Sequence, residues 1–162
     1  FGLLAIPMAS LPVVAADEQA SDGRVSTVTR LVKLFLDKEA SLGAAVRNAD
    51  AATLAGLLTD DFELRTSARA ASPVPRAEWM REILRTRQAG GAINRMAVHD
   101  FGPIAIASFT QDGPAGPVFI VDVWHRQETD WKLAVRYAGP AGSPAFAIPG
   151  GGANEPEFSK KY

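Results

Sequence analysis

Residues 118–137 read VFIVDVWHRQETDWKLAVRY, two β-strand patterns on either side of a short polar turn. Successive side chains in a strand point to opposite faces of the sheet, so this hairpin has one strongly aromatic face. A turn of two or four residues places Arg126 opposite Trp131 and Asp122 opposite Val135. The aromatic face then carries Ile120, Asp122, Trp124, Trp131, Leu133, Val135 and Tyr137. We expect this face to line the interior of a curved sheet.

Asp122 is the lone carboxylate on that face and the first candidate for a catalytic residue. Burial favours the protonated form of a carboxyl group, so Asp122 could carry a proton to or from a bound apolar ligand. Tyr137 is the second candidate, because its hydroxyl could donate a hydrogen bond to a ligand oxygen. A three-residue turn would instead place Asp122 beside Arg136 in a structural ion pair. Both roles of Asp122 stay open at the level of the sequence.

The rest of the chain predicts an α+β domain. Apolar residues recur at helical spacing over residues 26–47, with Glu39 as the one exception in the stripe. Asp50 is placed to cap a second, short helix, and Pro75 to open a third that ends before Gly90. Strand patterns cover residues 62–66, 93–101, 104–111, 118–126 and 131–138. We expect a curved antiparallel sheet with helices packed against one face.

Several segments occur in an order that points to a known family. They are the long first helix, the stretch NADAATLAGLLTDDF at 48–62, RAEWM at 76–80, DVW at 122–124 and WKL at 131–133. Together they resemble the nuclear transport factor 2-like superfamily, which includes ketosteroid isomerase-like and SnoaL-like proteins and bacterial members of unknown function. The resemblance implies that the curved antiparallel sheet forms a cone-shaped half-barrel closed by three N-terminal helices. Its members include isomerases, hydrolases, dehydratases, oligomerisation modules and non-catalytic binders, so the fold leaves the chemistry open.

Other side chains could contribute to a ligand pocket in such a barrel: Trp79, Ile83, Trp124, Val135, His99 and Asp61. Each has a competing structural role. A buried tryptophan is more often core than a ligand platform, and a histidine without a partner is more often at the surface. His99 and Asp100 are neighbours in a strand pattern and point to opposite faces, so they do not form a dyad. Asp60 and Asp61 are expected to end the second helix.

Composition excludes several classes of site. The formal net charge is −1 and the basic residues are scattered, so no nucleic acid or anionic membrane is expected as a partner. The chain has no cysteine, which excludes a disulfide, a thiolate nucleophile and a sulfur-based zinc site. Its two histidines, His99 and His125, lie far apart without carboxylates at ligand spacing. We therefore expect no metal and no cofactor.

The two ends differ from the middle of the chain. Residues 1–16 are apolar and uncharged, contain Pro7 and Pro12, and end in small residues before Asp17. This is typical of the end of a secretory signal peptide, which predicts export to a periplasm or out of the cell; an arm packed on the domain is the alternative. Residues 17–138 would form the domain. Residues 139–162 are rich in glycine and proline and are expected to form a tail.

Three functions compete at this point. The first is an exported, non-catalytic domain that binds a small apolar or amphipathic molecule inside the barrel. The second is an acid–base enzyme of the isomerase, cyclase or dehydratase kind that uses Asp122. The third is a homodimerisation module that associates through the outer face of the sheet, where Phe119, Val121 and Val123 are placed. Catalysis needs a second donor near the same ligand atom, and the sequence offers none that is convincing, so binding is favoured. The resemblance implies a homodimer through this outer face.

Overall fold

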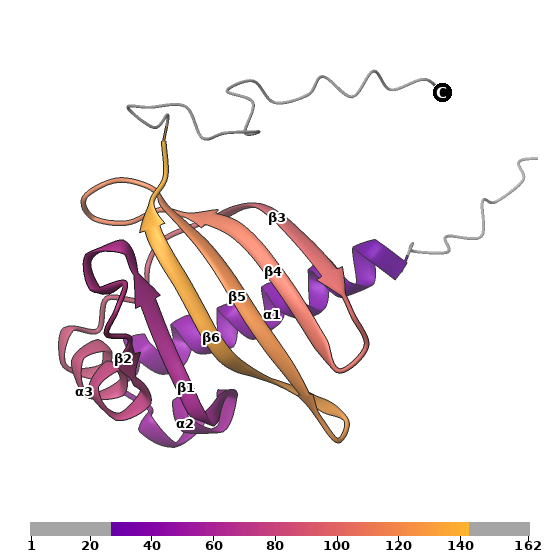
Figure 1. Cartoon of the computed structure of the whole chain (residues 1–162), viewed down its shortest axis with the longest axis horizontal. Helices are drawn as coiled ribbons and strands as arrows, with labels where there is room; N and C mark the ends of the chain where they lie inside the picture. The colour runs from indigo at the N-terminus through magenta and orange to yellow at the C-terminus, as the bar shows by residue number, and fades with distance from the viewer. Residues whose placement is uncertain (1–26, 143–162) are drawn as a thin grey trace, which may run out of the picture.

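The computed structural model describes residues 27–142, which form three α-helices on a six-stranded sheet (Figure 1). The helices are α1 (Thr27–Arg47), α2 (Ala51–Leu57) and α3 (Arg76–Thr86). A single 3-10 turn, η1, covers Ser67–Arg69. The strands are β1 (Leu58–Thr66), β2 (Val74–Pro75), β3 (Ile93–Asp100), β4 (Ile104–Gln111), β5 (Val118–Gln127) and β6 (Asp130–Pro140). The α+β class and the curved, cone-like sheet are confirmed.

The order of the strands in the sheet is β2-β1-β6-β5-β4-β3. β3 to β6 form the predicted antiparallel meander, but β1 pairs with β6 in parallel, so the expected all-antiparallel sheet is wrong. A parallel pair needs a long connection, and the whole segment from η1 to β5 supplies it. The three helices are also not all N-terminal to the sheet, because β1 and β2 precede α3. Short strand patterns gave no sign of which strand β1 would join.

α1 crosses one face of the sheet and supplies much of the core (Figure 1). Its inward side chains follow helical spacing, and Phe35, Glu39, Leu42 and Val46 are all buried. The helix begins one residue after the predicted start and ends where expected. Asp50 caps α2 as predicted, because its Oδ1 accepts a hydrogen bond from the Thr53 backbone N–H at 3.0 Å.

β1 begins earlier than the alternating pattern indicated. Asp60 and Asp61, which were expected to end a helix, lie inside this strand with exposed side chains. The register of β1 against β6 shifts between Leu58 and Glu63. Such an irregularity lets two successive residues face solvent without reversing the strand. Phe62 then returns to the core and is almost fully buried.

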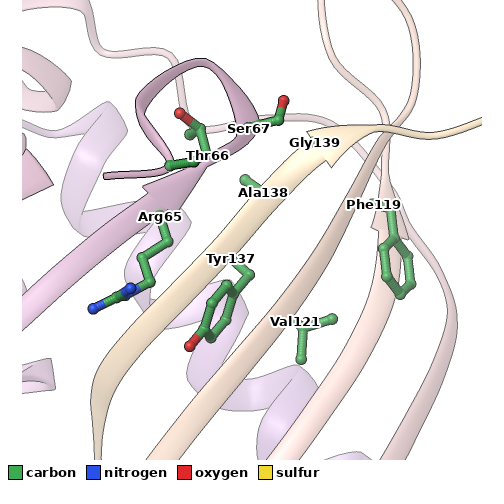
Figure 2. A pocket seen from close by; sticks show the side chains of 9 residues that line it. Arg65, Thr66, Ser67, Phe119, Val121, Tyr137, Ala138 and Gly139 are labelled. Atoms are coloured by element: carbon green, nitrogen blue, oxygen red, sulfur yellow. The ribbon is translucent and has the colours of Figure 1, made fainter. Parts of the chain in front are cut away.

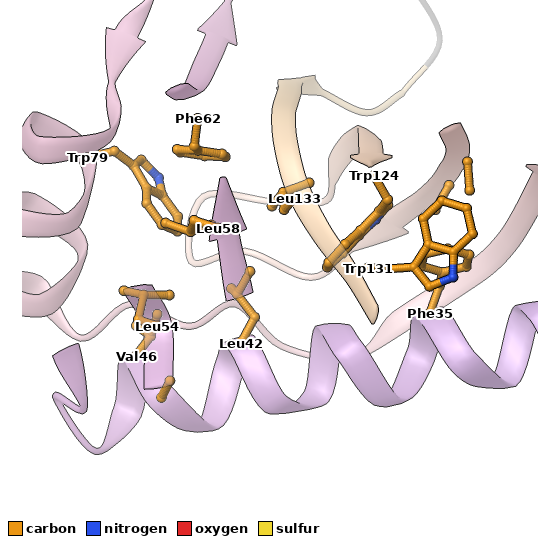
Figure 3. Close-up of a cluster of buried hydrophobic side chains, with 13 residues drawn as sticks. Phe35, Leu42, Val46, Leu54, Leu58, Phe62, Trp79, Trp124, Trp131 and Leu133 are labelled. Atoms are coloured by element: carbon orange, nitrogen blue, oxygen red, sulfur yellow. The ribbon is translucent and has the colours of Figure 1, made fainter. Parts of the chain in front are cut away.

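Aromatic rings fill the space between α1, α3 and the sheet (Figure 3). Phe35 packs against both Trp124 and Trp131 with ring centroids 5.5 Å apart. Phe62 lies 4.9 Å from Trp79 at the α3 end of the core. Tilted and edge-on contacts at these distances add to the free energy gained by burying the rings. Much of the cone interior is therefore solid core.

The β5–β6 hairpin closes through the two residues Glu128 and Thr129, and Arg126 lies opposite Trp131 as a two-residue turn predicts. Glu128 has a φ of 55°, whereas Thr129 is not in the positive-φ region. Because a type I′ turn needs positive φ at both positions, this turn is of another type. That fits a loop without glycine.

A β-bulge in β6 then changes the register. Ala134 is the extra residue, so Asp122 lies opposite Arg136 instead of Val135. Beyond the bulge the two faces of β6 exchange: Arg136 is buried, whereas Val135 and Tyr137 lie on the outer face. The predicted inward positions of Val135 and Tyr137 are therefore wrong. The turn has two residues, one of the lengths left open by the sequence, and the bulge produces the Asp122–Arg136 pairing that a three-residue turn would have given.

β6 extends to Pro140, two residues beyond the predicted end of the domain, and pairs there with Val118. Among residues 27–142, no helix has the length and apolar character needed to cross a bilayer. The predicted signal-peptide remnant at 1–16 and the part of the predicted tail after residue 142 lie outside the described residues. Export therefore stays a prediction.

Candidate functional site

A buried cluster of three ionisable side chains lies between α1 and the inner face of the sheet. Arg136 of β6 donates from Nε to Asp122 Oδ1 at 2.8 Å and from Nη2 to Asp122 Oδ2 at 2.6 Å. Nη2 also donates to Glu39 Oε2, on α1, at 2.7 Å. The three residues are 8%, 0% and 4% exposed for Arg136, Asp122 and Glu39 respectively. The guanidinium therefore joins the first helix to the two longest strands of the sheet.

Burial and the neighbouring charges determine which side chains of this cluster are ionised. Burial raises the pKa of Glu39 to about 8, although the positive charge of Arg136 opposes that effect. Burial disfavours the charged form of Arg136 too, but attraction by Asp122 and Glu39 outweighs it and holds the pKa of Arg136 above its ordinary value. At neutral pH Glu39 is therefore mainly protonated, and the cluster is close to neutral.

Glu39 keeps one oxygen without a partner. Its Oε2 accepts from Arg136, whereas Oε1 is buried and has no hydrogen-bond partner in the structure as described for residues 27–142. Buried polar atoms are normally paired, so an unpaired one marks either a strained position or a place where something binds. The carboxyl group of Glu39 also makes a side-chain hydrogen bond with Asp122, and this contact raises the pKa of Glu39 further.

A cavity of about 230 Å³ lies between α1, α3 and the inner face of the sheet. Its wall is mainly apolar and consists of Leu42, Val46, Leu64, Trp79, Ile83, Ala89, Val118, Ile120 and Ala138. The polar side chains that line it are Arg136, Gln88, Gln111 and Asp112. Trp79 and Ile83, predicted as ligand contacts, lie in this wall, and so does Arg136, whereas Asp122 does not.

A second hollow, of about 350 Å³, is lined by Glu39. It is bounded by α1 and by the chain that enters β3, and its polar side chains are Glu39, Arg47 and Gln111. Ala89 and Gln111 line both hollows, so the two adjoin. Arg136 therefore faces the first hollow, and its partner Glu39 faces the second.

Tyr137 is on the opposite face of the sheet. With Phe119 and Val121 it lines a shallow hollow of about 370 Å³ whose rim includes Arg65 and Ser67 (Figure 2). This hollow is larger than the inner cavity but is more open to solvent. Tyr137 is 45% exposed and cannot reach a ligand in the cavity beside Arg136. The two candidate catalytic residues, Asp122 and Tyr137, are therefore not brought together.

The remaining predicted contacts are dispersed. Trp124 is fully buried in the aromatic core, and Val135 is half-buried on the outer face of the sheet. His99 is exposed near the ring of Phe101. Asp61 lines a hollow of about 450 Å³ beside β2 and the start of α3. Among residues 27–142, no three His, Asp or Glu side chains come close enough to hold a metal ion.

Sequence reasoning missed the central role of two residues. Arg136 was considered only as the partner of Asp122 under a different turn, and Glu39 was noted only as the exception in an apolar helical stripe. A glutamate at a core-facing position is rarely buried unless it is paired or neutral. Applied to Glu39, this rule would have predicted from the sequence that the side chain has a buried partner or is neutral.

No protein-family model matches the chain, and no curated protein sequence matches it. Solved structures do. An NTF2-like protein from Cytophaga hutchinsonii is 18% identical with a TM-score of 0.56, covering 67% of this chain and 97% of its own. An NTF2-like protein of unknown function from Silicibacter pomeroyi is 10% identical with a TM-score of 0.57, covering 68% of this chain and 96% of its own.

The CaMKII hub of S. rosetta is also similar, with 18% identity, a TM-score of 0.55, and coverage of 67% of this chain and 95% of the hub. At these identities the likeness concerns the fold and leaves ligands and reactions open. The three helices and the curved six-stranded sheet are consistent with that fold. The chain thus has the NTF2-like fold that its sequence motifs predicted.

Proposed function

We propose that this domain binds a small, mainly apolar molecule in the cavity beside Arg136. The observation that carries the proposal is the cavity itself: an apolar wall between α1, α3 and the sheet, with one guanidinium in it. Ligand sites in proteins commonly combine an apolar lining with a few placed polar groups. The proposal keeps the binding function that the sequence favoured and moves the polar contact from Asp122 to Arg136.

The size of the cavity limits the ligand. At about 230 Å³ it is smaller than the pockets that hold drug-sized molecules, which begin at roughly 300 Å³. It is larger than an engineered cavity of about 150 Å³ that binds benzene. A molecule with one or two small rings, or a short branched chain, fits this range. A single acceptor atom on the ligand would suit the guanidinium.

Acid–base catalysis by Asp122 is the weaker alternative. Both of its oxygens accept hydrogen bonds from Arg136, and the residue is fully buried. Both oxygens are engaged by the guanidinium and Asp122 does not line the cavity, so it is not placed to exchange a proton with a ligand there. The arrangement suits a structural ion pair better than a general base.

Native mass spectrometry tests the binding proposal. The full chain purified from its host should carry an added mass of roughly 100–200 Da, the size that such a cavity holds. Denaturing mass spectrometry of the same sample should show the chain without that mass, because the ligand is not covalently bound. If the host produces the chain abundantly and all of it lacks the added mass, the result would count against the proposal.

Self-association is a second candidate function, favoured by the outer sheet face. We use that name for the surface made by Ile104, Ile106, Phe119, Val121, Val123, Val135 and Tyr137. Phe119 and Tyr137 are 47% and 45% exposed. In Figure 1, α1 crosses behind the sheet, and no helix of residues 27–142 covers the other side. A contiguous exposed apolar patch of this kind is typical of a protein interface.

A further inference from the structure

Arg136 uses three of its five N–H donors inside the buried cluster. The Nε hydrogen goes to Asp122 Oδ1, and Nη2 donates to both Asp122 Oδ2 and Glu39 Oε2. Nη1 carries two hydrogens but donates to no atom of residues 27–142. Both donors that the cluster leaves unused are therefore on one nitrogen of the guanidinium.

This unused nitrogen keeps accessible surface. In the described part of the chain, the fully buried side-chain atoms without a hydrogen-bond partner are Glu39 Oε1, Arg76 Nε and Trp124 Nε1. Nη1 of Arg136 is not one of them, so it is accessible, although the residue as a whole is only 8% exposed. Arg136 lines the cavity of about 230 Å³ and none of the other hollows described above. Nη1 is therefore the polar atom that the guanidinium offers to this cavity.

The positive charge of Arg136 is balanced before any ligand enters. Two carboxyl groups, those of Asp122 and Glu39, already contact the guanidinium, and one ionised carboxylate makes the cluster neutral. Among the described residues that line the cavity, Arg136 is the one cation, and Asp112 adds a further carboxyl group. A carboxylate ligand would therefore bring a negative charge into an apolar cavity without a cation to offset it, which is costly.

The same nitrogen disfavours an amine. A guanidinium donates hydrogen bonds and accepts none, so an N–H group on a ligand gains nothing from Nη1. An ammonium group would also be repelled by the positive charge of Arg136. A carbonyl oxygen, in contrast, accepts a hydrogen bond from Nη1 and brings no net charge. Because the rest of the wall is mainly apolar, the rest of the ligand is best suited as hydrocarbon.

We propose that the cavity takes an uncharged molecule through a carbonyl oxygen, which accepts a hydrogen bond from Nη1 of Arg136. The ligand is thus a small ketone, aldehyde, ester or amide, and the class excludes carboxylates and amines. This assignment rests on the binding function proposed above and adds the chemistry of its polar contact. The hydrocarbon part of the ligand contacts the apolar wall at Trp79 and Ile83.

Three probes of matched shape test this assignment: acetophenone, α-methylstyrene and benzoate. Each is a benzene ring with a two-branched carbon, which bears an oxygen and a methyl group, a methylene and a methyl group, or the two oxygens of a carboxylate. Each probe is titrated into the full chain, and the amides of Val118 and Ile120, in the cavity wall, are followed by two-dimensional NMR. Acetophenone should bind about tenfold more tightly than α-methylstyrene, since only acetophenone accepts a hydrogen bond from the charged guanidinium. Benzoate should bind at least about tenfold more weakly than acetophenone.

The outcomes separate the carbonyl contact from the binding function itself. Equal affinities for acetophenone and α-methylstyrene would overturn the contact with Nη1 and leave the cavity as an apolar binding site. Tighter binding of benzoate than of acetophenone would overturn the uncharged class of ligand. If none of the three probes shifts Val118 or Ile120, the assignment fails together with the binding function on which it rests.

The carbonyl stretch of bound acetophenone tests the contact without a substitution of Arg136, which would leave two buried carboxyl groups without their partner. Infrared difference spectra of carbon-13-labelled and unlabelled acetophenone are recorded with the full chain in excess. The bound carbonyl should absorb at a lower frequency than acetophenone in hexane, because a hydrogen bond weakens the C=O bond. Ile83→Trp fills the cavity from α3 and should return the band to its position in water. A bound carbonyl that absorbs as it does in hexane would overturn the contact with Nη1.

Discussion

At the scale of single residues, the fold depends on how Arg136 is satisfied. A buried guanidinium is tolerated only when carboxylates neutralise it and accept its hydrogens, and Asp122 does both through two parallel bonds. The bulge at Ala134 is what turns Arg136 toward Asp122. Asp122 is in this account a structural residue.

Asp122→Asn should lower the free energy of unfolding by about 3–5 kcal/mol, because it leaves a buried positive charge without its main partner. Urea unfolding followed by circular dichroism measures the change. Asp61→Asn makes the same chemical change at an exposed position of β1 and should alter stability by no more than about 0.5 kcal/mol. Equal stability of the two variants would show that the Asp122–Arg136 pair contributes little.

At the scale of elements, the sheet has two faces with different partners. The inner face packs on α1 and the aromatic core, whereas the outer sheet face leaves Phe119 and Tyr137 about half exposed. Antiparallel strands with one solvated face normally alternate apolar and polar residues. Here both faces of β5 are apolar over much of their length, and this is the basis for proposing self-association through the outer sheet face.

If that surface is another copy of the chain, Phe119→Asp should convert the dimer to a monomer. Light scattering coupled to gel filtration measures the mass of wild type and variant at the same concentration. Leu36→Asp is the matched control, because Leu36 is partly exposed on α1, on the helical side of the sheet. A wild-type chain that is monomeric at high micromolar concentration would contradict self-association through this face.

At the scale of the whole molecule, stability should depend on pH through Glu39. Its pKa rises from 4.5 to about 8 on folding, so the folded state binds an extra proton between these values. The stabilisation from that proton is complete below about pH 4.5 and is lost as the pH rises through about 8.

Urea unfolding of wild type and Glu39→Gln at pH 5 and pH 8.5 isolates this effect, since the other groups titrate alike in both chains. The wild-type chain should lose stability relative to Glu39→Gln as the pH rises. Parallel profiles of the two proteins would mean that Glu39 is not protonated by burial. A relative gain in wild-type stability with rising pH would contradict the direction of the shift.

The sequence predicted the elements better than their contacts. The helix around Phe35, the cap at Asp50 and the position of the hairpin turn were predicted correctly, because they depend on residues close in the chain. The alternating pattern gives no indication of the bulge at Ala134. The residues of β6 after the bulge that were predicted to face inward therefore face outward. The parallel pairing of β1 with β6 joins residues more than sixty positions apart, so local sequence patterns could not predict it either.

Sequence patterns report on residues close in the chain, and this also explains which features of the site were missed. Asp122 was found because it interrupts an apolar strand face, but its partner depended on the register. Glu39 interrupts the apolar face of α1 in the same way, and only the folded chain brings it within reach of Arg136. Isolated charges on apolar faces were the correct signal, and their pairing required the structure.

Indole binding tests the proposed cavity most directly. Indole is titrated into the full chain by NMR, beside Ile83→Trp, which fills the cavity from α3, and Ile106→Trp, which adds the same side chain on the outer sheet face. The account predicts that indole shifts the amides of Val118 and Ile120 in wild type and in Ile106→Trp, and not in Ile83→Trp. Indole bound equally by all three chains, or by none, would contradict a ligand cavity beside Arg136.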